Sequence, residues 1–132
     1  MSGHSGDFDV LTSGYIDRPD YRVDLLPRTN RVVARLGDRV IADSDRAVVV
    51  DEQGHALVWY FHPDDVRLDL LAPVAGKTSF CPFKGEATYF AAADDETATP
   101  IGWTYAQPLV QVAALGGYIA FYQDRVAITI AD

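Results

Sequence analysis

Short runs of β-branched and aromatic residues, separated by polar turns, form the hydrophobic pattern of the first half of the chain. Residues 31–36 and 40–42 flank Gly37-Asp38-Arg39, which is typical of a hairpin with a short glycine-containing loop. Further runs of this kind are residues 47–51 and 56–61, and residues 21–26 alternate in part. Four short strands with turns at close intervals predict a β-meander between residues 31 and 61.

The second half of the chain contains four more strand-like runs, at residues 86–92, 101–106, 118–122 and 126–130. Residues 62–71 break the alternating pattern, and Pro63 followed by carboxylates predicts at most one short helix there. Residues 108–113 fit either a strand or one helical turn. The pattern as a whole predicts a mostly β fold, a compact antiparallel domain of one or two packed sheets with one or two short helices.

Length and composition indicate one globular domain. The chain has 132 residues, of which 48% are hydrophobic and 23% charged, and it contains no internal repeat. Residues 1–20 are loosely patterned and are expected to form a flexible N-terminal tail, and residues 21–132 a single β-rich domain. Residues 97–123 carry no charged side chain, but prolines, glutamines and a glycine pair interrupt them. They are therefore expected to be buried core rather than a membrane span.

Charge and cysteine content narrow the possible partners of this acidic protein. The net charge is −8 and the basic residues are scattered singly, which argues against nucleic acid and against anionic membrane surfaces. The single cysteine, Cys81, cannot form an internal disulfide, and the N-terminal residues lack the pattern of a secretory signal. A soluble protein in the cytoplasm is therefore expected.

A segment in the middle of the chain contains the densest group of reactive side chains. Pro82 favours an extended backbone at Cys81, and Gly85 permits a backbone geometry or a close approach that other residues would not. Lys84 and Glu86 are two residues apart and would share a strand face. There the lysine could orient an anionic or carbonyl group while the glutamate acts as an acid or base. The alternative, which is the more common arrangement, is an exposed Lys–Glu pair beside a buried cysteine.

Five separated segments share a pattern with a known family. They are Asp43-Ser44, residues 62–66, residues 79–87, Trp103-Thr104-Tyr105 and Phe121-Tyr122. Together they resemble the bacterial and fungal family called domain of unknown function 427, over roughly residues 29–130, and the block Cys81-Pro82-Phe83-Lys84-Gly85 is the most specific part. The resemblance implies a compact β domain of one or two packed sheets, described as tent-like or sandwich-like, and it implies no established activity.

The chain departs from the family pattern at one place. Where this sequence has His62-Pro63-Asp64-Asp65-Val66, the family often has proline, arginine, an acidic residue, aspartate and valine, so no role of that arginine is transferred. Relatives bear the label nucleotidyltransferase. This sequence has no Gly-Ser followed by a paired-aspartate strand motif and no glycine-rich phosphate loop, so its residues do not support that activity.

Aromatic residues predict a ligand pocket. Trp103 and Tyr105 would share a face and Tyr89 would lie in a neighbouring strand, so these rings with a few polar groups could line a pocket. Trp59 and Phe121 are expected to fill the core instead. Other rings that could join the pocket or the core are Phe61, Tyr118 and Tyr122.

No metal and no other cofactor is expected. Asp64, Asp65 and Asp69 lie near His62, but their spacing is that of a solvated acidic turn and not of a calcium loop. No set of four cysteine and histidine ligands with zinc-binding spacing is present, and no Gly-x-Ser-x-Gly elbow supports a Ser/His/Asp triad.

Two functional hypotheses from different classes follow. In the first, a small-molecule pocket performs metal-free acid/base chemistry if the protein is an enzyme, with Glu86 as acid or base and Lys84 as charge stabiliser. In the second, the protein is a non-catalytic binding module or a homodimer formed along a strand edge or an apolar patch of residues 97–123. Cys81, the less favoured nucleophile, is expected to be buried and unreactive. The residues expected to line the pocket are Cys81, Lys84, Glu86, Tyr89, Trp103 and Tyr105.

Overall fold

The structure, a computed structural model, describes residues 13–131. Within this range ten strands form two antiparallel sheets, so the mostly β, antiparallel fold predicted from the sequence is confirmed. Of the tail expected at residues 1–20, the first twelve residues lie outside the described range. The strands are β1 (Val23–Pro27), β2 (Arg31–Leu36), β3 (Arg39–Ser44), β4 (Val48–Glu52), β5 (Val58–Phe61), β6 (Leu71–Cys81), β7 (Gly85–Ala92), β8 (Pro100–Thr104), β9 (Ile119–Phe121) and β10 (Ala127–Ala131). Three 3-10 helices accompany them, η1 (Pro63–Asp65), η2 (Leu68–Leu70) and η3 (Val110–Leu115).

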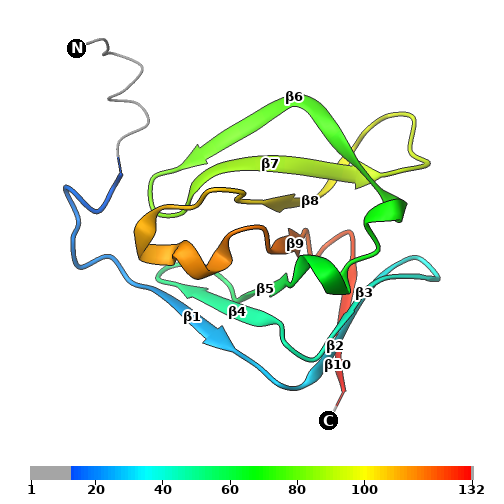
Figure 1. The fold of residues 1–132 in the computed structure, drawn as a ribbon, viewed down its shortest axis with the longest axis horizontal. Coiled ribbons are helices and arrows are strands. Elements are labelled where there is room, and N and C mark those ends of the chain that lie inside the picture. The colour runs from blue at the N-terminus through cyan, green and yellow to red at the C-terminus, as the bar shows by residue number, and fades with distance from the viewer. Residues whose placement is uncertain (1–12, 132) are drawn as a thin grey trace.

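The larger sheet has seven strands in the order β1-β4-β5-β9-β8-β7-β6, and the smaller sheet has three in the order β10-β2-β3. Figure 1 shows that the larger sheet curves, so that β6, β7 and β8 lie across from β1, β4 and β5. The helix η3 covers one side of this curved sheet, and the smaller sheet packs on the other side. The curvature gives the larger sheet an inner face on which a pocket can form.

The β-meander prediction is wrong, because the first four predicted strands belong to different sheets. β2 pairs with β3 and with the C-terminal strand β10, whereas β4 pairs with β1 and β5. The chain changes sheet at a polar corner, where the Ser44 hydroxyl and Arg46 Nε donate to the Asp65 carboxylate at 2.8 and 2.9 Å. This corner takes the place of a tight hairpin turn, and the next residue, Ala47, is completely buried between the sheets.

The sequence pattern does not predict β6, the longest of these strands. β6 is an edge strand with mostly exposed residues, and its register with β7 shifts between Pro73 and Thr78, around Gly76 with φ +75°. Edge strands tolerate proline because one side of the backbone has no partner strand. Residues 62–71 form the two short turns η1 and η2, where one short helix is predicted.

Residues 97–123 are only in part the buried core that the sequence predicts. β8 and β9 are largely buried, but much of the segment between them is exposed, and the Val110 side chain on η3 is 81% exposed. The described residues include no helix with the length and hydropathy of a membrane span. The uncharged segment therefore lies in two environments. Its strands β8 and β9 are in the sheet interior, and much of the connection between them is on the surface.

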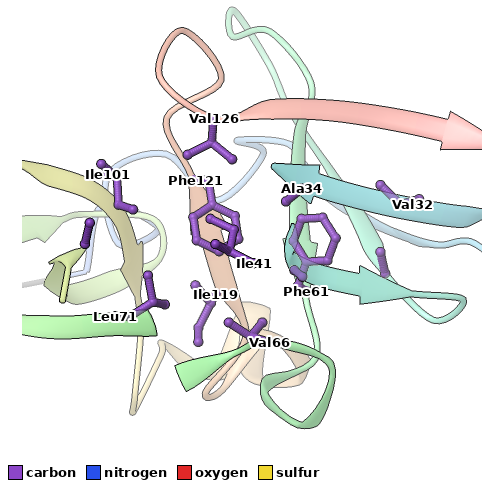
Figure 2. Packing of buried hydrophobic residues seen from close by; sticks show 13 residues of the cluster. Val32, Ala34, Ile41, Phe61, Val66, Leu71, Ile101, Ile119, Phe121 and Val126 are labelled. Carbon is purple, nitrogen blue, oxygen red and sulfur yellow. The ribbon is translucent and has the colours of Figure 1, made fainter. Parts of the chain in front are cut away.

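The core between the two sheets is built around Phe61 and Phe121, whose ring centroids are 5.7 Å apart. Figure 2 shows both rings between the sheets, and Ile41 from β3 belongs to the same cluster. Both rings are at most 1% exposed, and complete burial of such a side chain stabilises the fold by about 1.5–3 kcal/mol. The core position predicted for Phe121 is correct, whereas Trp59 is half-buried and packs against this cluster.

The inner face of the larger sheet carries a second cluster. Side chains alternate along a strand, so Tyr60 and Ala120, the chain neighbours of Phe61 and Phe121, belong to this second cluster. The same strands therefore support the core on one face and the pocket region on the other.

A β-bulge in β8 modifies this alternation. The register of β8 against β7 shifts between Pro100 and Gly102, which leaves Ile101 as the bulged residue. In a regular strand Ile101 and Trp103 would share a face. With the bulge, Ile101 packs in the core between the sheets while Trp103 packs against the second cluster.

We expect Gly102→Ala to destabilise the fold by about 1–3 kcal/mol. A Cβ at this position would lie 2.6 Å from the Ala120 carbonyl oxygen and 2.9 Å from Phe121 Cδ1, inside the sheet. Gly116→Ala is the matched control, because its nearest contact would be an ordinary 3.4 Å to the Ala113 carbonyl oxygen. Urea unfolding followed by tryptophan fluorescence measures both variants. Equal losses of stability would contradict the packing argument.

Candidate functional site

A pocket of about 500 Å³ opens on the inner face of the larger sheet. Its walls come from β4, β5, β7 and β8 and from the turn between β6 and β7. This volume lies in the range of small-molecule sites, and such sites combine apolar walls with a few polar groups. The polar lining includes Glu52, His55, Cys81 and Lys84. The aromatic lining consists of Tyr21, Tyr60, Phe83, Tyr89, Trp103, Tyr105 and Tyr122.

The turn that joins β6 to β7 places Lys84 in the pocket wall. Cys81 pairs with Gly85 across the turn, and the Lys84 N–H donates to the Cys81 carbonyl at 3.2 Å. Gly85 has φ +120°, and a Cβ there would lie 3.3 Å from Pro108 Cα in the loop before η3. The Leu109 N–H donates to the Lys84 carbonyl at 3.0 Å. The loop therefore holds the backbone of the turn, and the Lys84 side chain lines the pocket.

Lys84 forms a buried ion pair with Glu52, the last residue of β4. The two residues are 8% and 7% exposed, so the pair is largely removed from water. The Tyr21 hydroxyl donates to the other oxygen of the same carboxylate at 2.5 Å, and His55 Nε2 lies 3.5 Å from that oxygen. Both carboxylate oxygens of Glu52 therefore accept hydrogen bonds from the chain itself.

Two opposing effects set the pKa of Glu52. Burial favours the neutral acid, whereas the hydrogen bonds from Lys84 and Tyr21 favour the carboxylate. The hydrogen bonds prevail, and the pKa of the Glu52 carboxyl lies below its ordinary value. Burial, together with the hydrogen bond to Glu52, raises the pKa of Tyr21 to about 12. At neutral pH the site therefore holds a carboxylate and a neutral phenol beside the lysine.

Contacts between the rings fix the aromatic wall. Trp103 Nε1 donates to the Tyr60 hydroxyl at 3.1 Å, and the two rings are nearly perpendicular at 89°. Trp103 also packs on Tyr122, with ring centroids 4.9 Å apart. Burial raises the pKa values of Tyr60 and Tyr105, so both hydroxyls stay protonated at neutral pH. The wall therefore presents ring surfaces and neutral hydroxyl groups rather than charge.

Residues before β1 contact the β6–β7 turn. The Gly14 N–H donates to the Pro82 carbonyl at 2.7 Å, and the Tyr15 hydroxyl donates to the Phe83 carbonyl at 3.1 Å. Tyr21 stacks on Phe83 with ring centroids 3.6 Å apart and an interplanar angle of 10°. The segment from Ser13 to Tyr21 thus joins the start of the described chain to the turn that carries Lys84.

Five of the six residues predicted to line a pocket lie together in its wall, and Glu86 does not. Glu86 is exposed and is not part of the lining. The reason is that β7 begins at Gly85, so Lys84 belongs to the turn and the strand alternation that would put it on the same face as Glu86 does not apply. The five lining residues are Cys81, Lys84, Tyr89, Trp103 and Tyr105. Cys81 is half-buried in the pocket wall rather than buried as predicted, and its lack of reactivity stays a prediction.

Sequence reasoning misses Glu52, the carboxylate that Lys84 contacts, and the tyrosines Tyr21 and Tyr60. Glu52 is 32 residues from Lys84 in sequence, so no local spacing relates them. The one available signal is the pair Asp51-Glu52 after an apolar run, and many exposed strand ends have that feature.

A second, smaller cavity of about 290 Å³ lies beside the polar corner. Its most buried carboxylate, Asp65, is already bound by Ser44 and Arg46, and the Arg46 hydrogen bond holds the pKa of Asp65 below its ordinary value. Within residues 13–131, no group of three or more histidine, cysteine, aspartate or glutamate side chains is arranged to hold a metal ion. The chemistry of this corner is therefore accounted for by its own ion pairs.

We expect Glu52→Gln to lower the free energy of unfolding at neutral pH by about 1.5–3 kcal/mol, because Lys84 loses a charged acceptor. Folding lowers the pKa of Glu52, so its contribution is complete above the ordinary carboxyl range and is lost as the pH falls through the lowered value. The difference between wild type and variant should therefore shrink below about pH 4.

Urea denaturation at a series of pH values measures this difference. Glu86→Gln is the control, because Glu86 is exposed and should show little difference from wild type at any of these pH values. A stability difference for Glu52→Gln that stays constant into the acid range would contradict the assigned role of the ionised carboxylate.

Comparison with known proteins identifies a family, and the matched range includes most of the residues of the candidate site. No curated protein matches the chain. The family model described as Domain of unknown function (DUF427) matches residues 24–132, a range that includes every strand from β2 to β10, the ion pair and the β6–β7 turn. The resemblance seen in the sequence is thereby confirmed, and the chain belongs to the family Domain of unknown function 427.

Proposed function

We propose that this protein binds a small ring-containing molecule in the pocket and that Lys84 is its polar anchor. The observation that carries the proposal is a buried lysine in a wall otherwise made mainly of aromatic rings. A large apolar wall with one strong polar group is typical of sites that orient a small molecule.

The hydrogen-bonding capacity of Lys84 supports this role. An ammonium group has three N–H donors. Among contacts between described residues, Lys84 Nζ donates to Glu52, which leaves two donors for another acceptor. Burying a cation is unfavourable unless its donors are satisfied. Because Lys84 lines the pocket, an acceptor atom of a bound molecule is well placed to receive the remaining donors.

The aromatic lining favours a ring as the body of the ligand. A flat apolar ring packed against such side chains loses water contact, and each offset-stacked or edge-to-face pair adds about 0.5–1.5 kcal/mol. The hydrogen bond to Tyr60 and the contact with Tyr122 restrict the Trp103 ring. A wall that is already ordered reduces the entropy lost on binding.

Binding is better supported than acid/base catalysis. The catalytic pair expected from the sequence is Lys84 with Glu86, and Glu86 is exposed outside the lining. Glu52 is the carboxylate beside Lys84. It is a weak base, because its pKa is lowered and because both of its oxygens already accept hydrogen bonds, from Lys84 and from Tyr21. We therefore assign Glu52 the role of holding Lys84 rather than that of moving a proton.

We propose a small molecule as the partner of this protein, and we do not expect it to bind nucleic acid or a membrane. The net charge is −8 and the basic residues are scattered singly along the sequence. The buried lysine of the described pocket lining is paired with a carboxylate, so this lining offers no cluster of cations for a phosphate backbone. A free cysteine is common in reducing compartments, and we propose a cytoplasmic location on that basis.

A fragment screen by protein-observed NMR tests the proposal. Ring-containing fragments should shift the indole N–H resonance of Trp103, and Lys84→Met should bind the same fragments about tenfold more weakly, because the polar anchor is gone. Glu86→Gln is the matched control and should bind as wild type does. The absence of shifts with every fragment at millimolar concentration, or unaltered binding by Lys84→Met, would contradict the proposal.

Lys84→Met leaves the buried Glu52 without its cation and could reduce folding. A second variant therefore distinguishes weakened binding from a loss of folding. The double variant Glu52→Gln/Lys84→Met has an uncharged wall of similar shape, and replacing a buried ion pair as a whole is often neutral for stability. It should keep the native spectrum and show the same weakened binding.

A homodimeric interaction module is the second candidate function. Val110 in the uncharged segment is 81% exposed, and in a homodimer it would be covered by the second copy. Light scattering separates the two proposals. Under the binding proposal we expect the monomer mass of 14.5 kDa, unchanged in Val110→Asp. A dimer mass in wild type that returns to the monomer mass in Val110→Asp would favour the interaction module.

A further inference from the structure

We infer that the pocket selects uncharged ring compounds that carry a carbonyl oxygen over the corresponding carboxylates and phosphates, and that Glu52 sets this selectivity. The inference rests on the proposed binding function and goes beyond it by naming the ligand class. Its basis is the charge of the pocket wall, which is neutralised where a polar ligand group would bind.

The described lining contains one buried acid and one buried base. Glu52 and Lys84 are in direct contact, so their charges cancel at this point of the wall. His55 lies 3.5 Å from Glu52, and its side chain is 61% exposed, at the solvent side of the pair. Apart from His55, no second cation in the described lining can balance an anionic ligand.

A ligand carboxylate that reached Lys84 would also come close to Glu52. Because these two groups touch, the attraction to the ammonium and the repulsion from the carboxylate nearly cancel. The ligand would still lose its hydration on entering the pocket, and this loss would not be compensated. A phosphate, with up to two negative charges, would be disfavoured further.

A carbonyl oxygen avoids this penalty. It carries no net charge, and it accepts hydrogen bonds from the two Lys84 donors that Glu52 does not use. Hydrogen bonds from a charged donor are stronger than those between neutral groups. Ring amides, imides and lactams combine such an oxygen with a flat body for the aromatic wall.

Glu52 determines this selectivity through its charge rather than its shape. In Glu52→Gln the amide oxygen can still accept from Lys84, and the amide NH2 can donate to the Tyr21 hydroxyl oxygen, but the negative charge is gone. The wall would then carry a net positive charge from Lys84. A ligand carboxylate would neutralise that charge, so the preference should change from carbonyl compounds to carboxylates.

Matched pairs of probes test the inference by NMR titration. The pairs are benzamide with benzoate, nicotinamide with nicotinate, and indole-3-acetamide with indole-3-acetate, and phenyl phosphate is added as a dianion. All titrations are run at about pH 8, where the carboxylate probes are fully ionised. In wild type each amide should bind about tenfold more tightly than its carboxylate, and phenyl phosphate should not saturate.

The variants separate charge from shape. Glu52→Gln should reverse the ratio within each pair, and Lys84→Met should lose carboxylate binding by a larger factor than amide binding. Glu86→Gln should keep the wild-type ratio, because its carboxylate lies outside the lining. If Glu52→Gln loses the native spectrum, the wild-type ratio and Lys84→Met decide the question.

The outcomes distinguish this inference from the proposed function. Carboxylates that bind wild type as tightly as the amides, or an unchanged ratio in folded Glu52→Gln, would overturn the inference and leave the binding function standing. Binding of screened fragments without binding of any amide would have the same meaning. Failure of every probe and every fragment would overturn the proposed function and this inference with it.

Discussion

The contact between Lys84 and Glu52 joins the two ends of a curved seven-stranded sheet, and the pocket depends on it. Glu52 ends β4, which pairs with the edge strand β1, whereas Lys84 lies in the turn that links the opposite edge strand, β6, to β7. Tyr21 and Phe83 stack across the same junction. Strands that are far apart in the sheet order therefore meet at one point, and the strands between them line the enclosed space with aromatic rings.

A buried ion pair contributes little net stability to this junction. Desolvation of the two charges offsets much of their attraction, and apolar replacements of similar volume are often neutral or stabilising. The stack of Tyr21 on Phe83 already provides an apolar contact across the junction. What an apolar contact does not provide is a cationic donor at the pocket surface. The charged pair is therefore better explained by the proposed role of Lys84 as a ligand anchor than by stability alone.

Much of the fold, but only the local part of the site, could be predicted from the sequence. The hairpin of β2 and β3 has short β-branched runs and a clear turn signal, whereas the sequence does not predict β6, because an edge strand with Pro73 lacks that pattern. The Cys-Pro-Phe-Lys-Gly block and the Trp103/Tyr105 spacing indicated pocket residues that are near one another in sequence. Glu52 could not be found in this way, because only the curvature of the sheet brings it to Lys84, 32 residues away.

The two sides of the pocket differ in how firmly the fold supports them. On β5, Tyr60 faces the pocket while its neighbour Phe61 is fully buried in the core between the sheets, so the position of the ring is set by packing behind it. Tyr21 comes from a segment before β1 that has no core behind it and is held by its own contacts with Glu52 and Phe83. Segments with few buried contacts open at lower free energy than core strands. Adjustment of the pocket to ligands of different size should therefore come from the Tyr21 side, while the Tyr60 and Trp103 side stays fixed.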